Sequence, residues 1–253
     1  LGAEPEILIN MYKELIEDNS DIEVELKPNF GKTSFLYEAL KSGSVDIYPE
    51  FTGTITSSLL KEDVGEISND PNEVYDLAKR KIYEQDKLVL LPASKFQDTY
   101  AVAVREEFAK DNNIEKVSDL KNVEDNALAG FTLEFNDRDD GNRGLKSIYN
   151  LDLRVKTMEP ALRYTAISNG SIDITDVYST DSQIITNKLK VLEDDKKLFP
   201  PYQAAPLIRE DTLEKYPELE EILGKLKGKI TSKEMTEMNY KVDVEGKSAN
   251  EVA

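Results

Sequence analysis

Ala39-Leu40-Lys41-Ser42-Gly43-Ser44-Val45-Asp46-Ile47 recurs almost unchanged as Ala166-Ile167-Ser168-Asn169-Gly170-Ser171-Ile172-Asp173-Ile174. An aromatic residue follows four residues after the last isoleucine of each copy, Phe51 in the first and Tyr178 in the second. Each copy predicts a helix end, a glycine with positive φ, a short strand and a polar loop at its carboxyl end. Because ligands bind at that end of open α/β sheets, the repeat predicts two similar lobes that present aromatic rings to a cleft. Coincidence is the alternative, since helix–glycine–strand junctions are common in α/β proteins.

The composition narrows the possible functions. A chain of 253 residues is long enough for two cores. Its net charge of -18 argues against nucleic acid or an anionic membrane surface as partner and favours a cationic or zwitterionic solute. The absence of Cys and His excludes Cys/His zinc sites, Ser-His-Asp triads and thiolate nucleophiles, and we predict no cofactor. No apolar run reaches membrane-spanning length, and Leu1 opens without a signal peptide, so we expect a removed leader or a larger polypeptide.

Periodicity predicts an α/β fold. Apolar residues repeat at helical spacing over 7–16, alternate with polar residues over 22–26, and are followed by a helix over 33–40 and a strand over 44–47. This order indicates a parallel α/β sheet. We expect lobe 1 over 1–100, lobe 2 over 101–204, and a return segment over 205–253 that packs on lobe 1. The runs 99–104 and 203–208 are expected to be strands at the hinge between the lobes.

Several aromatic and hydroxyl residues follow the predicted strands or stand at the predicted hinge. Thr54 follows Phe51 after the first strand and is expected to be the N-cap of the next helix, where anions are favoured. Tyr100 and Tyr202 flank the two hinge strands, so with Phe51 and Tyr178 four aromatic rings are expected to converge. Such an enclosure suits a quaternary ammonium, because each ring face contributes about 0.5 to 2 kcal/mol of binding free energy.

Arg138 lies in the most polar loop, Glu134 to Gly141, shortly after a predicted strand. A guanidinium is the preferred clamp for a carboxylate, and neutralisation by the neighbouring aspartates is the alternative. A calcium-binding loop of the EF-hand type is rejected, because Arg138 would occupy a required oxygen-ligand position.

These motifs, spread over the whole chain, resemble the substrate-binding proteins of ABC importers for glycine betaine, choline and carnitine. The resemblance implies a two-lobed fold of the type II periplasmic-binding-protein kind, a permease and an ATPase as partners, and a location at the outer face of the cell membrane. It implies that Phe51, Tyr100, Tyr178 and Tyr202 form an aromatic cage for a betaine. It also implies that the Asp98 carbonyl faces the cation, and that Thr54 and Arg138 bind the ligand carboxylate.

Departures from the family pattern bear on the ligand. Phe51 replaces a tyrosine found in many relatives, and the opening Leu1-Gly2-Ala3-Glu4-Pro5-Glu6 is smaller than the usual loop. The opening resembles a subgroup fused to its permease that includes ergothioneine importers. We therefore expect ergothioneine as the ligand, with Glu50 as an acceptor for its imidazole-thione N–H. A smaller betaine or choline is the alternative.

Two rival functions come from other classes. A hydrolase with paired carboxylates is one, but it needs two carboxylates at a fixed separation, and acidic residues on an acidic chain mostly form solvated faces. A ligand-sensing domain joined to a signalling partner is the other, because one fold serves both functions.

Overall fold

The computed structural model describes residues 3–253, which divide into two compact units. Unit 1 comprises the residues up to Asp98 together with Pro201–Ala253, and unit 2 comprises Thr99–Pro200. Strand β3 (Tyr100–Arg105) follows the first crossing between units and strand β8 (Ala204–Arg209) follows the second. Each of these two strands therefore lies wholly within one unit.

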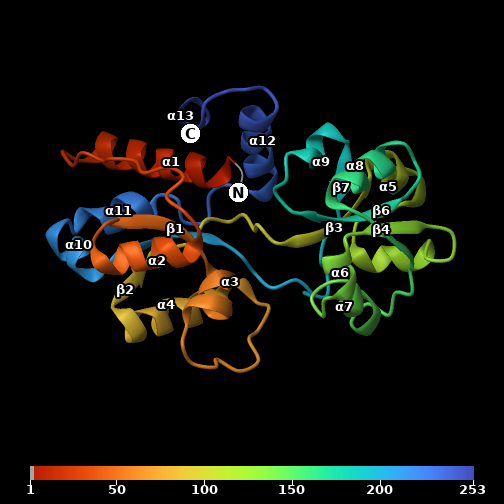
Figure 1. Cartoon of the computed structure of the whole chain (residues 1–253), viewed down its shortest axis with the longest axis horizontal. Coiled ribbons are helices and arrows are strands. Elements are labelled where there is room, and N and C mark those ends of the chain that lie inside the picture. Colours follow the sequence, from red (N-terminus) through yellow and green to blue (C-terminus); the bar gives the residue numbers. More distant parts are fainter. Residues whose placement is uncertain (1–2) are drawn as a thin grey trace. The chain divides into compact units, whose positions relative to one another are not determined.

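Unit 1 is built on a three-stranded sheet of order β1-β8-β2, in which β1 (Ile47–Phe51) and β2 (Leu88–Leu90) both pair antiparallel with β8. Its helices cover both faces (Figure 1): α2 and α4 pack on one face through Leu40 and Ile82, and α1 and α11 pack on the other through Ile16 and Leu223. The helices of unit 1 are α1 (Glu4–Asn19), α2 (Thr33–Ser42), α3 (Thr52–Thr54), the π-helix η1 (Ile55–Leu59), α4 (Pro71–Asp86), α10 (Glu210–Lys215), α11 (Glu218–Gly224), α12 (Ser232–Asp243) and α13 (Ala249–Val252).

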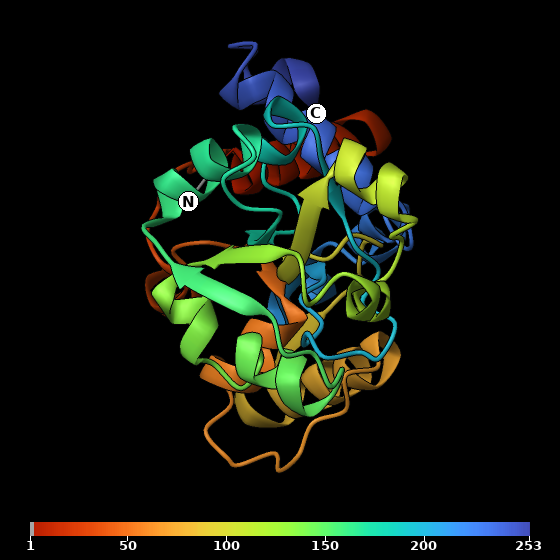
Figure 2. The ribbon, with the colours of Figure 1, turned by 90° about the vertical axis from the view of Figure 1, so that its right-hand side faces the viewer.

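Unit 2 is built on a five-stranded mixed sheet of order β5-β4-β6-β3-β7. Strands β5, β4 and β6 run parallel, whereas β3 is antiparallel to both β6 and β7. Helices α6 and α7 cover one face and α8 the other, as Figures 1 and 2 show. The remaining elements are β4 (Leu128–Phe131), β5 (Arg154–Thr157), β6 (Ile174–Tyr178), β7 (Leu189–Val191), α5 (Glu106–Asn112), the 3-10 helix η2 (Val117–Asn122), α6 (Leu133–Asp137), α7 (Asn142–Ser147), α8 (Pro160–Ser168) and α9 (Gln183–Thr186).

Two predictions about the sheets are wrong. Neither sheet is parallel: the sheet of unit 1 is antiparallel, because β8 runs opposite to both of its neighbours, and the sheet of unit 2 is mixed, because β3 runs opposite to β6 and β7. The segment 22–26, predicted as a strand, has no regular secondary structure and pairs with no strand among residues 3–253; its Ile22 and Val24 pack against the apolar cluster of α1 and α11 instead. The alternation of apolar residues over 22–26 thus reflects a segment that packs one side against the protein without joining a sheet.

The repeated segment has the same local structure in both units. Gly43 has φ 88° and Gly170 has φ 82°, values that a glycine adopts without the steric penalty of a side chain. Downstream of each glycine the chain bonds back into the helix, from Val45 N–H to the Ala39 carbonyl (3.2 Å) and from Ile172 N–H to the Ala166 carbonyl (3.3 Å). The predicted helix–glycine–strand junction is therefore confirmed in each copy.

An arginine holds each junction from the neighbouring strand. Arg209, at the end of β8, donates to the carbonyls of Leu40 and Val45 and pairs with Asp46 at 2.5 Å. Arg105, at the end of β3, makes the equivalent bonds to Ile167, Ile172 and Asp173, with an ion-pair distance of 2.8 Å. Each arginine thus joins the last turn of a helix to the residues that lead into the following strand, and so fixes where that strand begins.

Candidate functional site

In unit 1 the end of β1 brings an aromatic pair together. The Phe51 ring meets the Phe96 ring edge to face, with 6.5 Å between centroids. The Tyr202 ring lies against Gly53, where an added Cβ would be 2.8 Å from two ring carbons. Gly53 is therefore required for Tyr202 to lie beside the turn that follows Phe51.

Backbone bonds attach the remaining expected residues of unit 1 to this turn. The Asp98 N–H donates to the Tyr202 carbonyl at 3.0 Å, and the Thr52 N–H donates to the Gln203 carbonyl at the same distance. Thr54 was expected to be an N-cap, but the helix begins two residues earlier at Thr52 and Thr54 lies in its first turn. Unit 1 thus brings together Phe51, Thr54, Asp98 and Tyr202.

Glu50, the expected acceptor for the ligand N–H, does not share a face of β1 with the Phe51 ring. It is 2% exposed and shares the α2 and α4 face of β1 with Tyr48, whereas Phe51 packs on the opposite face. Its carboxylate accepts from the Tyr48 hydroxyl at 2.7 Å and from the Phe51 N–H at 2.9 Å. Burial raises the pKa of Glu50 to about 7, against the opposing effect of these two donors. The earlier expectation of Glu50 as a ligand acceptor is corrected by this placement.

In unit 2 two tyrosines form a stacked pair. Tyr100 and Tyr178 are directly opposite in the antiparallel pairing of β3 with β6, and their rings lie 5.2 Å apart with an interplanar angle of 23°. Burial raises the pKa of Tyr100, and hydrogen bonds with Tyr178 and Glu134 act in the same direction. Tyr178 remains 49% exposed, so this ring is open to solvent at the edge of the unit.

Arg138 joins the same group from the α6–α7 loop. Its guanidinium carbon lies 5.3 Å from the centre of the Tyr100 ring. Asp140 accepts from Nε at 2.6 Å and from Nη2 at 2.9 Å, and Glu134 accepts from Nη1 at 3.2 Å. Neighbouring carboxylates thus engage three of the five N–H donors of Arg138, as the neutralisation hypothesis predicted. Two N–H donors remain, which the hypothesis of a clamp for a ligand carboxylate requires.

A cavity of about 640 Å³ opens beside the tyrosine pair, within unit 2. Its lining includes Tyr100, Tyr178 and Glu134, together with a buried ion pair in which the Arg163 guanidinium lies 3.4 Å from the Asp176 carboxylate. Asp176 also accepts from the Thr132 N–H and hydroxyl, each at 3.0 Å, and Thr132 caps α6. Burial raises the pKa of Asp176 even though Arg163 opposes the shift. The ion pair therefore fixes the helix that carries Glu134.

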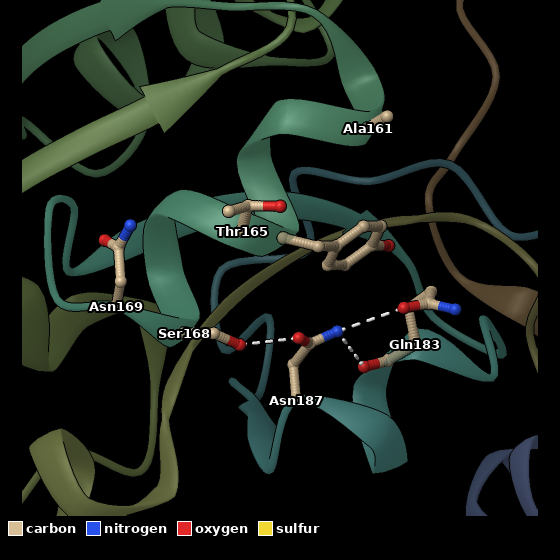
Figure 3. Close-up of a pocket in the computed structure, with 7 residues that line it drawn as sticks. Ala161, Thr165, Ser168, Asn169, Gln183 and Asn187 are labelled. Atoms are coloured by element: carbon tan, nitrogen blue, oxygen red, sulfur yellow. Dashed lines mark hydrogen bonds between the residues drawn. The ribbon is translucent and has the colours of Figure 1, made fainter.

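A second cavity, of about 730 Å³, lies between α8 and α9. Figure 3 shows its polar side chains bonded to one another: Ser168 donates to Asn187, which donates to Gln183. None of the expected site residues lines it. Its lining amides are largely satisfied within the protein, and we assign it no function.

Sequence reasoning missed the charged partners of the site. Asp176 carried a signal, since a carboxylate within the apolar strand Ile174–Tyr178 requires a buried partner. Arg163 and Glu134 carried none, because nothing in their local pattern distinguishes them from other charged helix residues.

Over residues 3–253 no group of three or more carboxylates is arranged to hold a metal ion. No helix in the same range is both long and apolar enough to cross a membrane.

Comparisons with known proteins agree on one family. The family model for the substrate binding domain of the ABC-type glycine betaine transport system matches residues 2–253. The carnitine transport binding protein OpuCC of Listeria monocytogenes is 36% identical over 254 residues, covering 99% of this chain and 82% of that protein. The ergothioneine transport permease/ergothioneine binding protein EgtU of Helicobacter pylori is 35% identical over 224 residues, covering 88% of this chain and 40% of that protein.

Solved structures give the same result for the fold. A crystal structure of a glycine betaine/carnitine/choline ABC transporter protein has a TM-score of 0.91 and 32% identity, covering 99% of this chain and 93% of that one. Apo YehZ from Escherichia coli has a TM-score of 0.89 and 25% identity, covering 99% of this chain and 92% of that one. The α/β architecture with two sheets is the type II periplasmic-binding-protein fold of these neighbours. The chain therefore belongs to the family of substrate-binding domains of ABC-type glycine betaine transport systems, which are binding proteins and not enzymes.

Proposed function

We propose that this chain captures a trimethylammonium betaine for an ABC importer. The observation that carries the proposal is the stack in unit 2, in which Arg138 lies over Tyr100 and Tyr100 stacks on Tyr178. Ring faces and a guanidinium match the two ends of a betaine. The family membership supports the same ligand class, since OpuCC is named for carnitine and the family for glycine betaine.

The chemistry of the ligand explains the residue types. A trimethylammonium group has no N–H to donate, so it is held by ring faces and by nearby oxygens. Tyr178 offers the open face of the pair, because Tyr100 is already covered by Arg138 and Tyr178. The remaining N–H groups of Arg138 suit a carboxylate. The proposed ligand contacts are Tyr100, Arg138 and Tyr178 in unit 2 and Phe51, Thr54, Asp98 and Tyr202 in unit 1.

Ergothioneine is the finer proposal for the ligand. It is supported by the 35% identity to EgtU and by the small residues at the opening of the chain, of which Gly2 lies outside the described residues. Ala3 is buried in unit 1 against Ile7 and Ala249. Glu50 no longer supports this ligand, because its carboxylate is buried and bonded within the protein. Carnitine and glycine betaine are the competing members of the class.

Binding proteins of this family work with a permease and an ATPase. We propose that this chain delivers its ligand to such a permease at the outer face of the cell membrane. A covalent link to the permease is a further proposal, and EgtU, whose printed name joins permease and binding protein, supports it.

Isothermal titration calorimetry of the purified chain tests the function. Glycine betaine, carnitine, choline and ergothioneine are titrated separately, and NMR of the recovered ligand checks that it is chemically unchanged. At least one ligand is expected to bind with a Kd well below 1 mM. The absence of binding by all four at millimolar concentration would overturn the proposal. Competition between ergothioneine and glycine betaine at equal concentration shows which of these two ligands binds more tightly.

A further inference from the structure

We propose that Glu134 sets the preference of this chain between cationic and zwitterionic quaternary amines. The inference rests on the proposed function and concerns which members of the class are accepted. Glu134 lies in the first turn of α6, and its side chain is 63% exposed. It lines the cavity that also contains Tyr100 and Tyr178, and it contacts both Tyr100 and Arg138.

The charge of Arg138 is already matched without Glu134. Asp140 binds the guanidinium through both of its carboxylate oxygens, at 2.6 Å and 2.9 Å, and this hydrogen bonding raises the pKa of Arg138. A bidentate carboxylate compensates one guanidinium charge. Glu134 adds a second negative charge at 3.2 Å from the same guanidinium. Arg138 with its two partners is therefore a net anionic cluster.

The other charges of the cavity do not compensate this excess. Arg163 and Asp176 in its lining pair with each other, and Lys156 and Glu159 contribute opposite charges to the same lining. A ligand at the tyrosine pair therefore meets a surplus carboxylate beside the ring faces. Glu134 attracts a trimethylammonium group at this position, and it repels a carboxylate that approaches the remaining N–H groups of Arg138.

Choline and glycine betaine separate these two effects, because both carry a trimethylammonium group and only glycine betaine carries a carboxylate. In the Glu134→Gln variant, choline is expected to bind about threefold more weakly and glycine betaine about threefold more tightly, a size typical of an exposed charge. The ratio of their Kd values then changes about tenfold. Glu134→Lys is expected to shift the ratio further in the same direction, which distinguishes charge from side-chain shape.

Asp139→Asn is the matched control. Asp139 belongs to the same loop and its side chain is 97% exposed, and its ion-pair partner is Arg143, at 3.9 Å, rather than Arg138. The variant removes the same formal charge from the same region and should leave the ratio within about twofold of the wild-type value.

Calorimetry at low ionic strength with all four proteins tests the inference, with thermal unfolding to establish that each is folded. An unchanged ratio in Glu134→Gln and Glu134→Lys, or an equal change in Asp139→Asn, would overturn the role of Glu134 while leaving betaine binding intact. If wild-type protein binds none of the four ligands of the previous titration, the proposed function and this inference fall together.

Discussion

Replacing Glu50 by glutamine is expected to stabilise the protein at neutral and alkaline pH. The carboxylate of Glu50 is buried beneath α2 and α4, where it accepts from Tyr48 and from the Phe51 N–H. Within residues 3–253, the groups that act on its pKa are Tyr48 and the Phe51 N–H, and neither is a cation. Glutamine keeps the shape and can accept from one donor while the Tyr48 hydroxyl turns to accept from its amide.

The magnitude follows from the pKa of Glu50, which burial raises from 4.5 to about 7. Between these values the folded protein binds a proton that the unfolded chain has released, so the free energy of unfolding falls as pH rises. Below pH 4.5 both states are protonated and the loss is absent; above pH 7 it is complete. At 1.36 kcal/mol per pH unit the loss amounts to about 3 kcal/mol. Glu50→Gln removes this titration.

Urea unfolding at pH 4.5 and pH 8.5 measures the effect through the difference in unfolding free energy between variant and wild type. That difference should become about 3 kcal/mol more favourable to Glu50→Gln at the higher pH. Glu14→Gln, an exposed position on α1, controls for the loss of one acidic charge. A difference independent of pH, or equal changes for the two variants, would refute the assignment of a buried titrating carboxyl.

Substitutions at three further positions test the candidate site and its scaffold. Tyr178→Ala should raise the Kd of any trimethylammonium ligand about tenfold, and Tyr178→Phe should raise it less. Tyr83→Ala on α4 is the control, and an unchanged affinity of Tyr178→Ala in calorimetry would show that this ring does not contact the ligand. Arg138→Ala should weaken glycine betaine at least tenfold and choline little, and equal losses would contradict a carboxylate clamp. Gly53→Ala should lower the free energy of unfolding in urea by about 1–3 kcal/mol, because its Cβ would lie 2.6 Å from the Pro201 carbonyl. Gly224→Ala is the control, since its Cβ meets nothing within 4 Å. Equal stabilities of the two variants would argue against close packing of Tyr202 on Gly53.

The sequence predicted the helices over 7–16 and 33–40 and the helix–glycine–strand junction of each repeat copy, because these depend on local patterns. Gly43 and Gly170 mark helix ends through a conformation that belongs to glycine itself. Strand direction was not predictable in the same way. The orientation of β8 depends on its pairing with β1 and β2, and these pairings join residues more than 100 positions apart.

The placement of Glu50 was available from the sequence but was interpreted wrongly. Adjacent residues of a strand point to opposite faces, so Glu50 and Phe51 cannot both face a ligand at the same side of β1. For Arg138 the limitation was different. The loop offers Asp137, Asp139 and Asp140 as partners, and only the three-dimensional turn at Gly141 selects Asp140. Local composition gives the charge of such a loop but not its pairing.

The two copies of the repeat supply aromatic rings by different means. Arg209 and Arg105 fix the same junction, so Phe51 and Tyr178 end equivalent strands. Their cross-strand partners differ: Tyr178 faces Tyr100 and stacks on it, whereas Phe51 faces Ala204, which has no ring. In unit 1 the ring that meets Phe51 belongs instead to Phe96, and Tyr202, two residues before Ala204, lies on Gly53. The shared junction therefore determines where the first ring lies, and the residue that faces it on the partner strand determines whether a second ring stacks on it.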